Sequence, residues 1–241
     1  MEYSCISDIG LLREKNQDSY LYIENNFGDI LAIVADGIGG GKAGEVASGE
    51  LVKYFNNTFK ESGPFETIEN AIDYMQFHLE KANNCVYELS LTENKYSGMG
   101  TTITGMLITS KGSISLNCGD SRVYGFIDKK AFKLTTDHTL INQMIENGEI
   151  TYEESLNHPK RHYLVKAVGI FDKVGFDVHK VKEMDYYLIC SDGLHGYVSE
   201  EEIIKIVYDD TKTIEEKVIE LKDISLLKGG YDNVTVILIK K

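Results

Sequence analysis

The feature that most constrains the fold is a sustained apolar stripe in residues 65–90. Its apolar residues recur every three or four positions, which is the period of an α-helix. They are Ile68, Ile72, Met75, Leu79, Ala82, Val86 and Leu89. A helix with one apolar face needs a second apolar surface to cover that face. A coiled-coil seam with another helix would meet this need, but we favour the alternative in which the helix lies on a sheet.

Strand patterns and helix patterns occur in groups along the rest of the chain. β-branched and aromatic runs indicate strands, whereas helical spacing and capping boxes indicate helices. We expect a hairpin at 20–35, helices at 43–60 and 65–90, strands at 101–109, 113–128 and 131–137, a polar helical segment at 139–157, strands at 174–183 and 186–192, helices at 199–209 and 213–227, and a final strand at 233–241. This grouping predicts an α+β layered sandwich.

The chain offers no sign of a domain boundary. It contains only two prolines and no linker-like tract, and it has no repeats. Its 241 residues are enough to bury one sizeable core. We therefore expect a single domain over residues 1–241.

Composition excludes several classes of function. The net charge of −13 argues against a protein that binds a phosphate backbone through a basic face. No apolar run approaches the ~20 residues of a membrane span, and the first residues lack the pattern of a signal peptide. The four cysteines include no C-x-x-C pair, which indicates reduced thiols in a cytoplasmic protein. None of them is followed six positions later by the Arg that a cysteine phosphatase needs.

A glycine-rich loop follows Asp36, and it permits three interpretations. A P-loop would need Gly at position 36 and Ser or Thr at position 43, but these residues are Asp36 and Ala43. The dinucleotide fingerprint G-x-G-x-x-G matches Gly39, Gly41 and Gly44, although a carboxylate at position 36 would repel a pyrophosphate. The third interpretation is a metal site, in which the glycines let a backbone carbonyl turn toward an ion beside Asp36.

The rest of the chain favours the metal site, because four more aspartates lie at the ends of predicted strands. They are Asp18, Asp120, Asp192 and Asp232. Each alone would be an ordinary turn or cap residue, but together with Asp36 they predict one acidic pocket. Carboxylates gathered in this way repel one another unless cations neutralise them. Oxygen ligands favour Mg²⁺ or Mn²⁺ over zinc, and bound ions would attract an anionic substrate to an acidic protein.

These segments resemble the metal-dependent protein serine/threonine phosphatases of type 2C, the PPM family, in its short bacterial form. The similar segments occur in the family's order and span nearly the whole chain. They are SDIGLLREKNQDS (7–19), VADGIGGGKAGEVAS (34–48), MGTTIT (99–104), CGDSRVY (118–124), LTTDHT (134–139), LVKAVG (164–169), CSDGLHGYVSEEEI (190–203) and GGYDNVTVIL (229–238). The resemblance implies a four-layer α/β/β/α sandwich, in which two antiparallel sheets pack face to face between outer helices.

The resemblance also implies a set of metal ligands for Mn²⁺ or Mg²⁺. Asp36 would bridge two tightly bound ions, and the Gly37 carbonyl would bind one of them. Asp192 and Asp232 would complete the coordination of the other ion. Asp120, together with Asp192, would hold a weaker third ion.

The implied activity is hydrolysis of phosphoserine and phosphothreonine in proteins. A hydroxide that bridges the two ions would attack phosphorus directly, without a phosphoenzyme. Arg13 would grip the substrate phosphate, Asp18 would orient metal-bound water, and Asn233 would lie beside the site. With Asp36, these form the implied catalytic set.

Three positions depart from the family pattern. Ile38 stands where eukaryotic members carry a His that is proposed to protonate the leaving group, and an aliphatic side chain cannot do so. Gln17 stands where many eukaryotic relatives have Glu. Lys166 stands where bacterial relatives often have Arg, and we expect little effect, because a Lys that faces the phosphate keeps the charge although it loses the planar fork.

Several other residues have simpler interpretations. We expect His138 to be a structural hydrogen-bonding residue, and Cys118 and Cys190 to be small core residues beneath the site. His158 and His162 are four positions apart, but Pro159 makes a helical metal face unfavourable. They are expected in a mobile segment near the site, the family's flap.

The family context implies phosphoprotein substrates and a bacterial serine/threonine kinase whose action is reversed. We expect a monomer with no nucleic-acid or membrane partner. Two other functions stay open. One is a catalytically silent phosphoprotein-binding module on the same fold, against which the intact aspartates argue. The other is the nucleotide-binding oxidoreductase that Gly39, Gly41 and Gly44 suggest.

Overall fold

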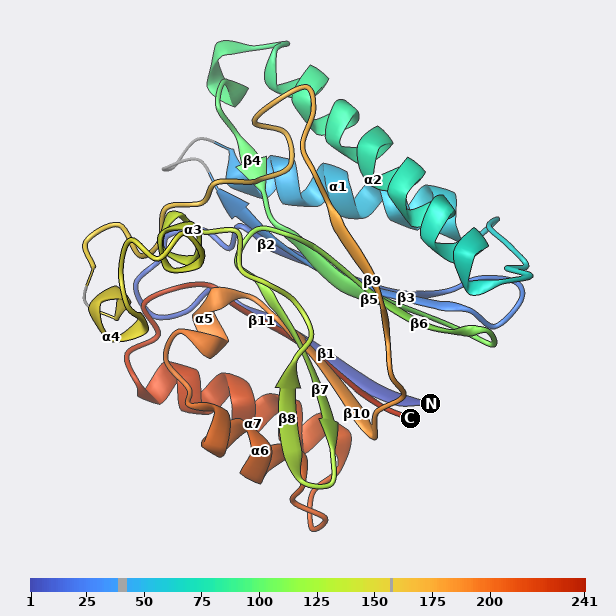
Figure 1. Ribbon diagram of the computed structural model, residues 1–241, viewed down its shortest axis with the longest axis vertical. Coiled ribbons are helices and arrows are strands. Elements are labelled where there is room, and N and C mark those ends of the chain that lie inside the picture. Colours follow the sequence, from blue (N-terminus) through green and yellow to red (C-terminus); the bar gives the residue numbers. More distant parts are fainter. Residues whose placement is uncertain (39–42, 157) are drawn as a thin grey trace.

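Two antiparallel sheets pack face to face, and helices cover both outer faces (Figure 1). The structure is a computed structural model that describes residues 1–38, 43–156 and 158–241. The strand order is β1-β11-β10-β7-β8 in the first sheet and β2-β3-β5-β6-β9 in the second, with β4 paired to β3. The predicted α+β four-layer sandwich is therefore confirmed.

The strands that form the two sheets come from both halves of the chain. The first sheet contains β1 (Glu2–Asp8), β7 (Arg122–Ile127), β8 (Lys130–Lys133), β10 (Tyr186–Cys190) and β11 (Val234–Lys240). The second contains β2 (Asp18–Glu24), β3 (Ile30–Ile38), β4 (Gly100–Thr101), β5 (Ile103–Thr109), β6 (Gly112–Cys118) and β9 (Asp177–Val181). The first and last strands of the chain are thus neighbours in one sheet.

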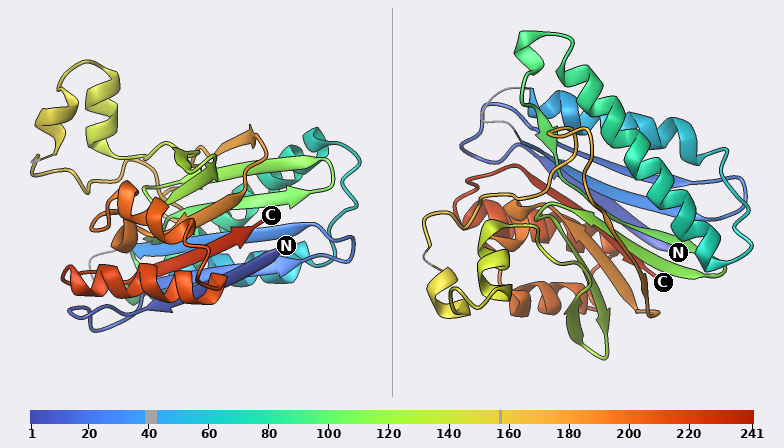
Figure 2. Two further views of the ribbon diagram at one scale, coloured as in Figure 1. Left: turned by 90° about the horizontal axis from the view of Figure 1, so that it is seen from below. Right: turned by 45° about the horizontal axis from the view of Figure 1, so that its top comes forward.

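The helices divide into two covering layers and one projecting pair. The covering helices are α1 (Gly44–Phe59) and α2 (Ile68–Ser90) on the second sheet, and α6 (Glu200–Val207) and α7 (Ile214–Leu227) on the first. The short elements are η1 (Asn94–Tyr96), α3 (Leu140–Glu146), α4 (Tyr152–Ser155) and α5 (Asp192–His195). Figure 2 shows α3 and α4 standing out from the layered body. Among the described helices, none combines the length and the apolar content that a bilayer span requires.

Three apolar cores separate the four layers, and strand alternation creates them. In β3, Leu31, Ile33 and Ala35 face α1 and α2. Their neighbours Ile30, Ala32 and Val34 face the other sheet. This is the two-residue period of a strand that is buried on both faces. The stripe predicted in residues 65–90 contributes Met75, Leu79, Ala82 and Val86 to the core against the second sheet, so the helix-on-sheet interpretation is confirmed.

The structure differs from the sequence prediction at a few elements. Residues 2–8 form strand β1, which the sequence analysis did not identify. Their side chains are only exposed or partly buried, and the strand is held at the sheet edge by backbone pairing with β11. The segment 139–157, predicted to be helical, contains two short helices, α3 and α4, and its last residue lies outside the described residues.

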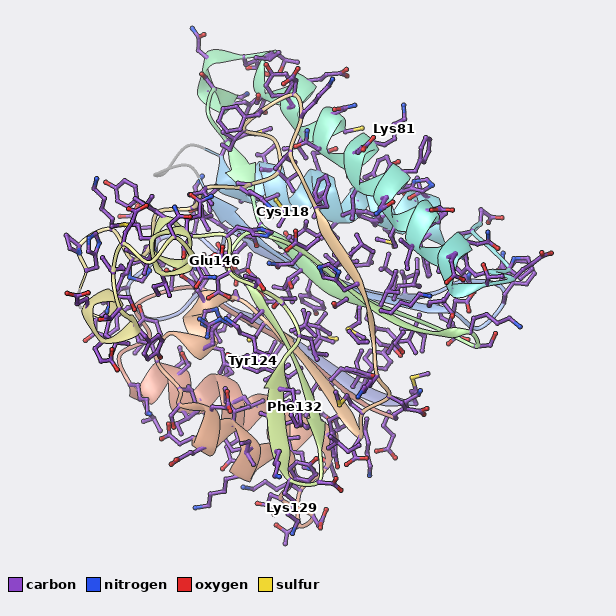
Figure 3. The ribbon with its side chains drawn as sticks, in the orientation of Figure 1. Lys81, Cys118, Tyr124, Lys129, Phe132 and Glu146 are labelled. Atoms are coloured by element: carbon purple, nitrogen blue, oxygen red, sulfur yellow. The ribbon has the colours of Figure 1, made fainter. Side chains whose placement is uncertain are left out.

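The two ends of the sheets are different in character. The chain termini lie together at one end, where Glu2 pairs with Lys240. Figure 3 labels Lys129 and Phe132 in the β7–β8 hairpin, away from α3 and its Glu146. At the opposite end β2 and β11 begin and β3, β6 and β10 finish. The predicted site residues therefore all belong to segments at one end of the sandwich.

Candidate active site

A cavity of about 540 Å³ opens at this end of the two sheets. Its lining comes from segments that are far apart in the chain: Arg13, Gln17, Asp36, Gly37, Ile38, Asp120, His162, Leu164, Asp192, Tyr197, Tyr231, Asp232 and Asn233. Every predicted site residue except Asp18 is among them. The structure thus brings together the aspartates that the sequence analysis gathered from separate strand ends.

The backbone of Asp36 is fixed by the threonines of the segment MGTTIT. Thr102 Oγ1 accepts a hydrogen bond from the Asp36 N–H at 3.0 Å. The Thr102 N–H and the Thr101 hydroxyl donate to the Asp36 carbonyl at 2.8 and 3.0 Å. The Thr102 hydroxyl also hydrogen-bonds the Ser121 hydroxyl at 2.8 Å. Because Ser121 follows Asp120, this network ties the two candidate ligands to one another.

Gly37 is a position at which the packing permits no side chain. A methyl group there would overlap the carbonyl of Gly44 at the start of α1, and it would lie 2.6 Å from the carbonyl oxygen of Gln17. The Gly37 N–H donates to that same Gln17 carbonyl at 3.0 Å. The glycine therefore lets strand β3, the start of α1 and the segment before β2 meet at the cavity wall.

Asp18 lies beneath the cavity, paired with Asp36 across β2 and β3. It is only 8% exposed. Its Oδ2 accepts a hydrogen bond from the Ser191 hydroxyl at 2.7 Å, and Ser191 Oγ in turn accepts from the Thr235 N–H at 3.0 Å. Asp18 is therefore held by groups from the other sheet and supports Asp36 from behind.

Asp192 is the first residue of α5, directly after strand β10. The following Gly193 is packed so closely against Asn233 that a methyl group would overlap the Asn233 carbonyl. The Ser225 hydroxyl donates to the Gly193 carbonyl at 2.6 Å. These contacts place Asp192 beside the segment that carries Asp232.

A loop at residues 9–17 brings Arg13 to the same segment. Gly10 has a φ of +79°, which favours glycine, and a methyl group there would overlap the Asp232 carbonyl. Arg13 Nη2 lies 2.6 Å from Asp232 Oδ2, and the Arg13 side chain is about half exposed (49%). The guanidinium is thus at the cavity mouth, with an aspartate as its counter-ion.

Asn233 uses all of its side-chain polar atoms to hold this loop. Its Nδ2 donates to the carbonyls of Ile9 and Lys15, each at 2.9 Å. Its Oδ1 accepts from the Gln17 N–H at 2.8 Å. The side chain is 5% exposed. Asn233 therefore fixes the loop that carries Arg13 through three hydrogen bonds to its backbone.

Two histidines hold the turn that carries Asp120. His195 Nε2 lies 3.0 Å from the Asp120 carbonyl oxygen and donates to it. On the other side, His138 Nδ1 accepts from the Gly119 N–H at 3.1 Å, and its Nε2 lies 3.0 Å from Asp177 Oδ2. The structural role expected for His138 is therefore confirmed.

Four carboxyl groups in and beneath the cavity, those of Asp18, Asp36, Asp120 and Asp192, have raised pKa values. Desolvation, followed by the charge of neighbouring aspartates, raises the pKa values of Asp36 and Asp192 well above their usual range. Desolvation also raises the pKa of Asp18 and that of Asp120 to about 6. Such shifts are expected where like charges share a poorly solvated site. Without a counter-charge, these groups resist ionisation.

The donor set fits a hard divalent cation. Oδ1 of Asp18 and Oδ1 of Asp192 are buried and have no hydrogen-bond partner among the described residues. A buried carboxylate oxygen without a partner is costly, and a cation would satisfy it. Within residues 1–38, 43–156 and 158–241, however, no three His, Cys, Asp or Glu side chains are already arranged to hold an ion.

The expectation that Lys166 faces the phosphate is wrong. Its Nζ lies 3.5 Å from Asp177 Oδ1 and 3.3 Å from His138 Nε2. Lys166 is not among the residues that line the cavity. His162, by contrast, does line the cavity.

The structure also describes the positions of Ile38, Gln17 and the four cysteines. Ile38 and Gln17 both line the cavity. Cys118 and Cys190 are fully buried, and burial raises the pKa of each thiol to about 12, as inert core residues require. All four cysteines are free thiols. The fingerprint glycines at positions 39 and 41 lie outside the described residues.

Sequence reasoning missed the residues that support the aspartates. They are Thr101, Thr102, Ser121, Ser191 and His195, together with Tyr197 and Tyr231 in the lining. The threonines lie in the segment MGTTIT, and Ser191 and His195 flank Asp192 in CSDGLHG. Their position beside candidate ligands was the available signal, but no spacing rule reveals which carboxyl or carbonyl a hydroxyl will contact.

Known proteins match this chain over nearly its full length. A family model described as protein phosphatase 2C matches residues 13–224. The serine/threonine phosphatase stp of Listeria monocytogenes serotype 4b is 34% identical, over 98% of this chain and 94% of its own length. The protein phosphatase PhpP of Streptococcus pneumoniae is 32% identical, over 99% of this chain and 97% of its own.

The fold matches in the same way. The crystal structure of the serine/threonine phosphatase Stp1 from Staphylococcus aureus superposes with a TM-score of 0.93 at 32% identity, and the match covers 100% of this chain and 94% of that one. Two stacked sheets with an acidic pocket at one end, matched at this level, define the class of metal-dependent serine/threonine phosphatases of type 2C. The chain belongs to this protein phosphatase 2C family, in the bacterial form that includes Stp and PhpP.

Proposed function

We propose that this protein hydrolyses phosphoserine and phosphothreonine in phosphoproteins with the help of bound Mn²⁺ or Mg²⁺. The observation that carries the proposal is the cavity itself. Asp36, Asp120, Asp192 and Asp232 reach it from four separate segments, and Arg13 lies at its mouth. Acidic donors beside a guanidinium suit a site that binds cations first and a phosphoryl group afterwards.

The residues assigned to the cations are those that the family resemblance implies, and all of them line the cavity. Asp36, the Gly37 carbonyl, Asp192 and Asp232 would hold two ions. Asp120 would hold a weaker third ion together with Asp192. Bound divalent cations would supply Lewis-acid activation of water and neutralise charge on the phosphoryl oxygens. The buried, unpartnered Oδ1 atom of Asp192 supports this assignment.

The chain's own side chains would bind and orient the substrate. Arg13 can donate two parallel hydrogen bonds to phosphoryl oxygens, once its guanidinium exchanges Asp232 for the substrate. Asp18 would accept a hydrogen bond from water in the cavity through its free Oδ1. Asn233 would act as a positioning residue, because its amide holds the Arg13 loop at three backbone atoms. Ile38 offers no proton to a leaving group.

The proposed function also implies a cellular setting for the protein. The whole chain, residues 1–241, would act as one phosphatase domain and as a monomer in the cytoplasm. Its counterpart would be a bacterial serine/threonine kinase that phosphorylates the same substrates. The family membership supports the phosphoprotein substrates, and the net charge of −13 supports the absence of a nucleic-acid partner.

Hydrolysis of a phosphothreonine peptide tests the proposal. We would measure phosphate release with Mn²⁺, with Mg²⁺ and with EDTA, for the wild type and for Asp36→Asn. Activity should require metal, and Asp36→Asn should lower it by roughly a thousandfold or more while the circular dichroism spectrum stays unchanged. An active Asp36→Asn protein would contradict the assignment of Asp36 as a metal ligand. A folded wild type that binds phosphopeptide but never releases phosphate would favour the silent binding module.

A further inference from the structure

Exposed apolar side chains lie in the loops that carry Arg13 and Asp232. We define the apolar rim as Leu11, Leu12 and Tyr231. Their exposed fractions are 64%, 65% and 53%. Single exposed apolar residues are ordinary, but Tyr231 lines the cavity, Leu11 is hydrogen-bonded to the preceding Gly230, and Leu12 directly precedes the cavity residue Arg13. Their location, rather than their number, requires an explanation.

The two loops of the rim pack through backbone atoms, so the apolar side chains stay free. The Leu11 N–H donates to the Gly230 carbonyl at 2.8 Å. Gly230 has a φ of +52°, and a methyl group on it would lie 2.7 Å from Leu11 Cγ. The glycine therefore admits Leu11 beside it without covering the leucine. The fold does not need these side chains to be buried.

The rim is continuous with the cavity. Tyr231 itself lines the cavity, as does Arg13, which directly follows Leu12. The Tyr231 ring lies 5.6 Å from the ring of Tyr197, another cavity residue. A phosphoryl group held by Arg13 would therefore place the neighbouring residues of a bound peptide over the rim.

The apolar character of the rim narrows the class of flanking residue. The rim consists of two leucines and a tyrosine, and the neighbouring Arg13 already pairs with Asp232. Leucine and tyrosine side chains gain most from covering another apolar side chain. The surroundings thus favour an apolar residue next to the phosphorylated one.

We propose that the apolar rim binds a bulky apolar side chain that flanks the phosphoserine or phosphothreonine of the substrate. This inference rests on the proposed function. It names the substrate class as phosphopeptides with Leu, Ile, Phe or Met beside the modified residue. Partial burial of one such side chain corresponds to roughly a tenfold preference in kcat/KM.

Matched phosphothreonine peptides test the proposal. One series carries Leu at each flanking position in turn, and the other carries Gly at the same positions. We compare wild type with Leu11→Ser/Leu12→Ser and with Leu91→Ser. Leu91 is equally exposed (68%) and lies at the C-terminal end of α2. Hydrolysis of p-nitrophenyl phosphate, which has no flanking residues, corrects for any change in the cavity itself.

The expected result is a Leu-over-Gly preference of about tenfold at one or two positions. The ratio of kcat/KM for the Leu peptide to that for the Gly peptide should fall toward one in the double variant Leu11→Ser/Leu12→Ser. The same ratio should stay at the wild-type value in Leu91→Ser. A wild type without any preference, or a double variant that keeps it, overturns the proposal.

A binding measurement separates this inference from the proposed function. Fluorescence anisotropy with Asp36→Asn reports peptide affinity without turnover. Tighter binding of the Leu peptide, lost in the triple variant with Leu11→Ser/Leu12→Ser, supports the rim even if the wild type releases no phosphate. Equal affinities for both peptides overturn the rim even if hydrolysis proceeds.

Discussion

The two walls of the cavity are built in different ways. On the β2–β3 side, Asp18 and Asp36 sit at strand positions, and hydroxyl groups of Thr102 and Ser191 fix them. In a second wall, loops 9–17 and 229–233 meet through glycines and the amide of Asn233, and they leave Arg13 half exposed. The sheet wall buries its carboxyl groups and fixes them by hydrogen bonds. The loop wall keeps side chains free for a substrate.

The first way to test this contrast is to add one methyl group to the sheet wall. Gly37→Ala would force a methyl group into the Gly44 carbonyl. We expect a loss of roughly 3 kcal/mol in the free energy of unfolding and a larger proportional loss of metal-dependent activity. Urea denaturation and phosphate release measure the two effects.

A matched control is Gly49→Ala within α1, where an added methyl group meets nothing within 4 Å. Alanine in a helix should raise stability by about 0.5–1 kcal/mol. If both variants behaved alike, the close packing at Gly37 would have no consequence.

The crowded carboxylates of the sheet wall also predict a pH dependence of stability in the metal-free protein. Desolvation raises the pKa of Asp18 from 3.8 to about 6 in the folded state. Between these values, the unfolded chain has lost the proton and the folded chain still binds it. The free energy of unfolding therefore falls as pH rises from about 4 to 6, by roughly 3 kcal/mol.

Denaturation of the EDTA-treated protein across this range measures the effect. Asp18→Asn should make the profile less steep, and Asp36, Asp120 and Asp192, whose pKa values are also raised, should keep the rest of the slope. Saturating Mn²⁺ should offset the loss above pH 6 because a cation neutralises the site. A profile that rises with pH through this window would contradict the assignment of a desolvated carboxyl.

The same contrast explains what the sequence could predict. Apolar alternation and the helical stripe predicted the layers, and aspartates at strand ends predicted the acidic wall. Strand β1 was missed because its stability comes from pairing with β11, which a local pattern does not contain. Lys166 was misplaced for a similar reason, since its partner Asp177 lies on β9, eleven positions further along the chain. Local patterns report burial and turns, whereas pairing between segments that meet only in the fold stays invisible.

The loop wall predicts a competition between Arg13 and bound metal. Arg13 neutralises Asp232 at 2.6 Å, so Arg13→Ala should free this ligand. We expect a rise of about tenfold in KM for phosphopeptides and, at the same time, a modestly tighter binding of Mn²⁺. Steady-state kinetics and calorimetric titration measure these opposite changes.

Arg13→Lys is the matched control, because it keeps the charge and loses the planar fork. It should raise KM while leaving Mn²⁺ affinity near the wild-type value. An unchanged KM in Arg13→Ala would return Arg13 to the role of a surface ion-pair residue.

The smallest expected effect concerns the turn between the walls, where His195 donates to the Asp120 carbonyl at 3.0 Å. Asp120→Asn should reduce activity while two ions stay bound. His195→Ala should cost only one hydrogen bond, about 1 kcal/mol, and so raise the Mn²⁺ concentration needed for full activity a few-fold. His195→Gln, which can still donate, should recover most of this loss.

Desolvation lowers the pKa of His195 to about 3, so the imidazole is neutral at ordinary pH. The effect should therefore be the same at pH 6 and pH 8, and a strong pH dependence would show that His195 acts through its charge instead.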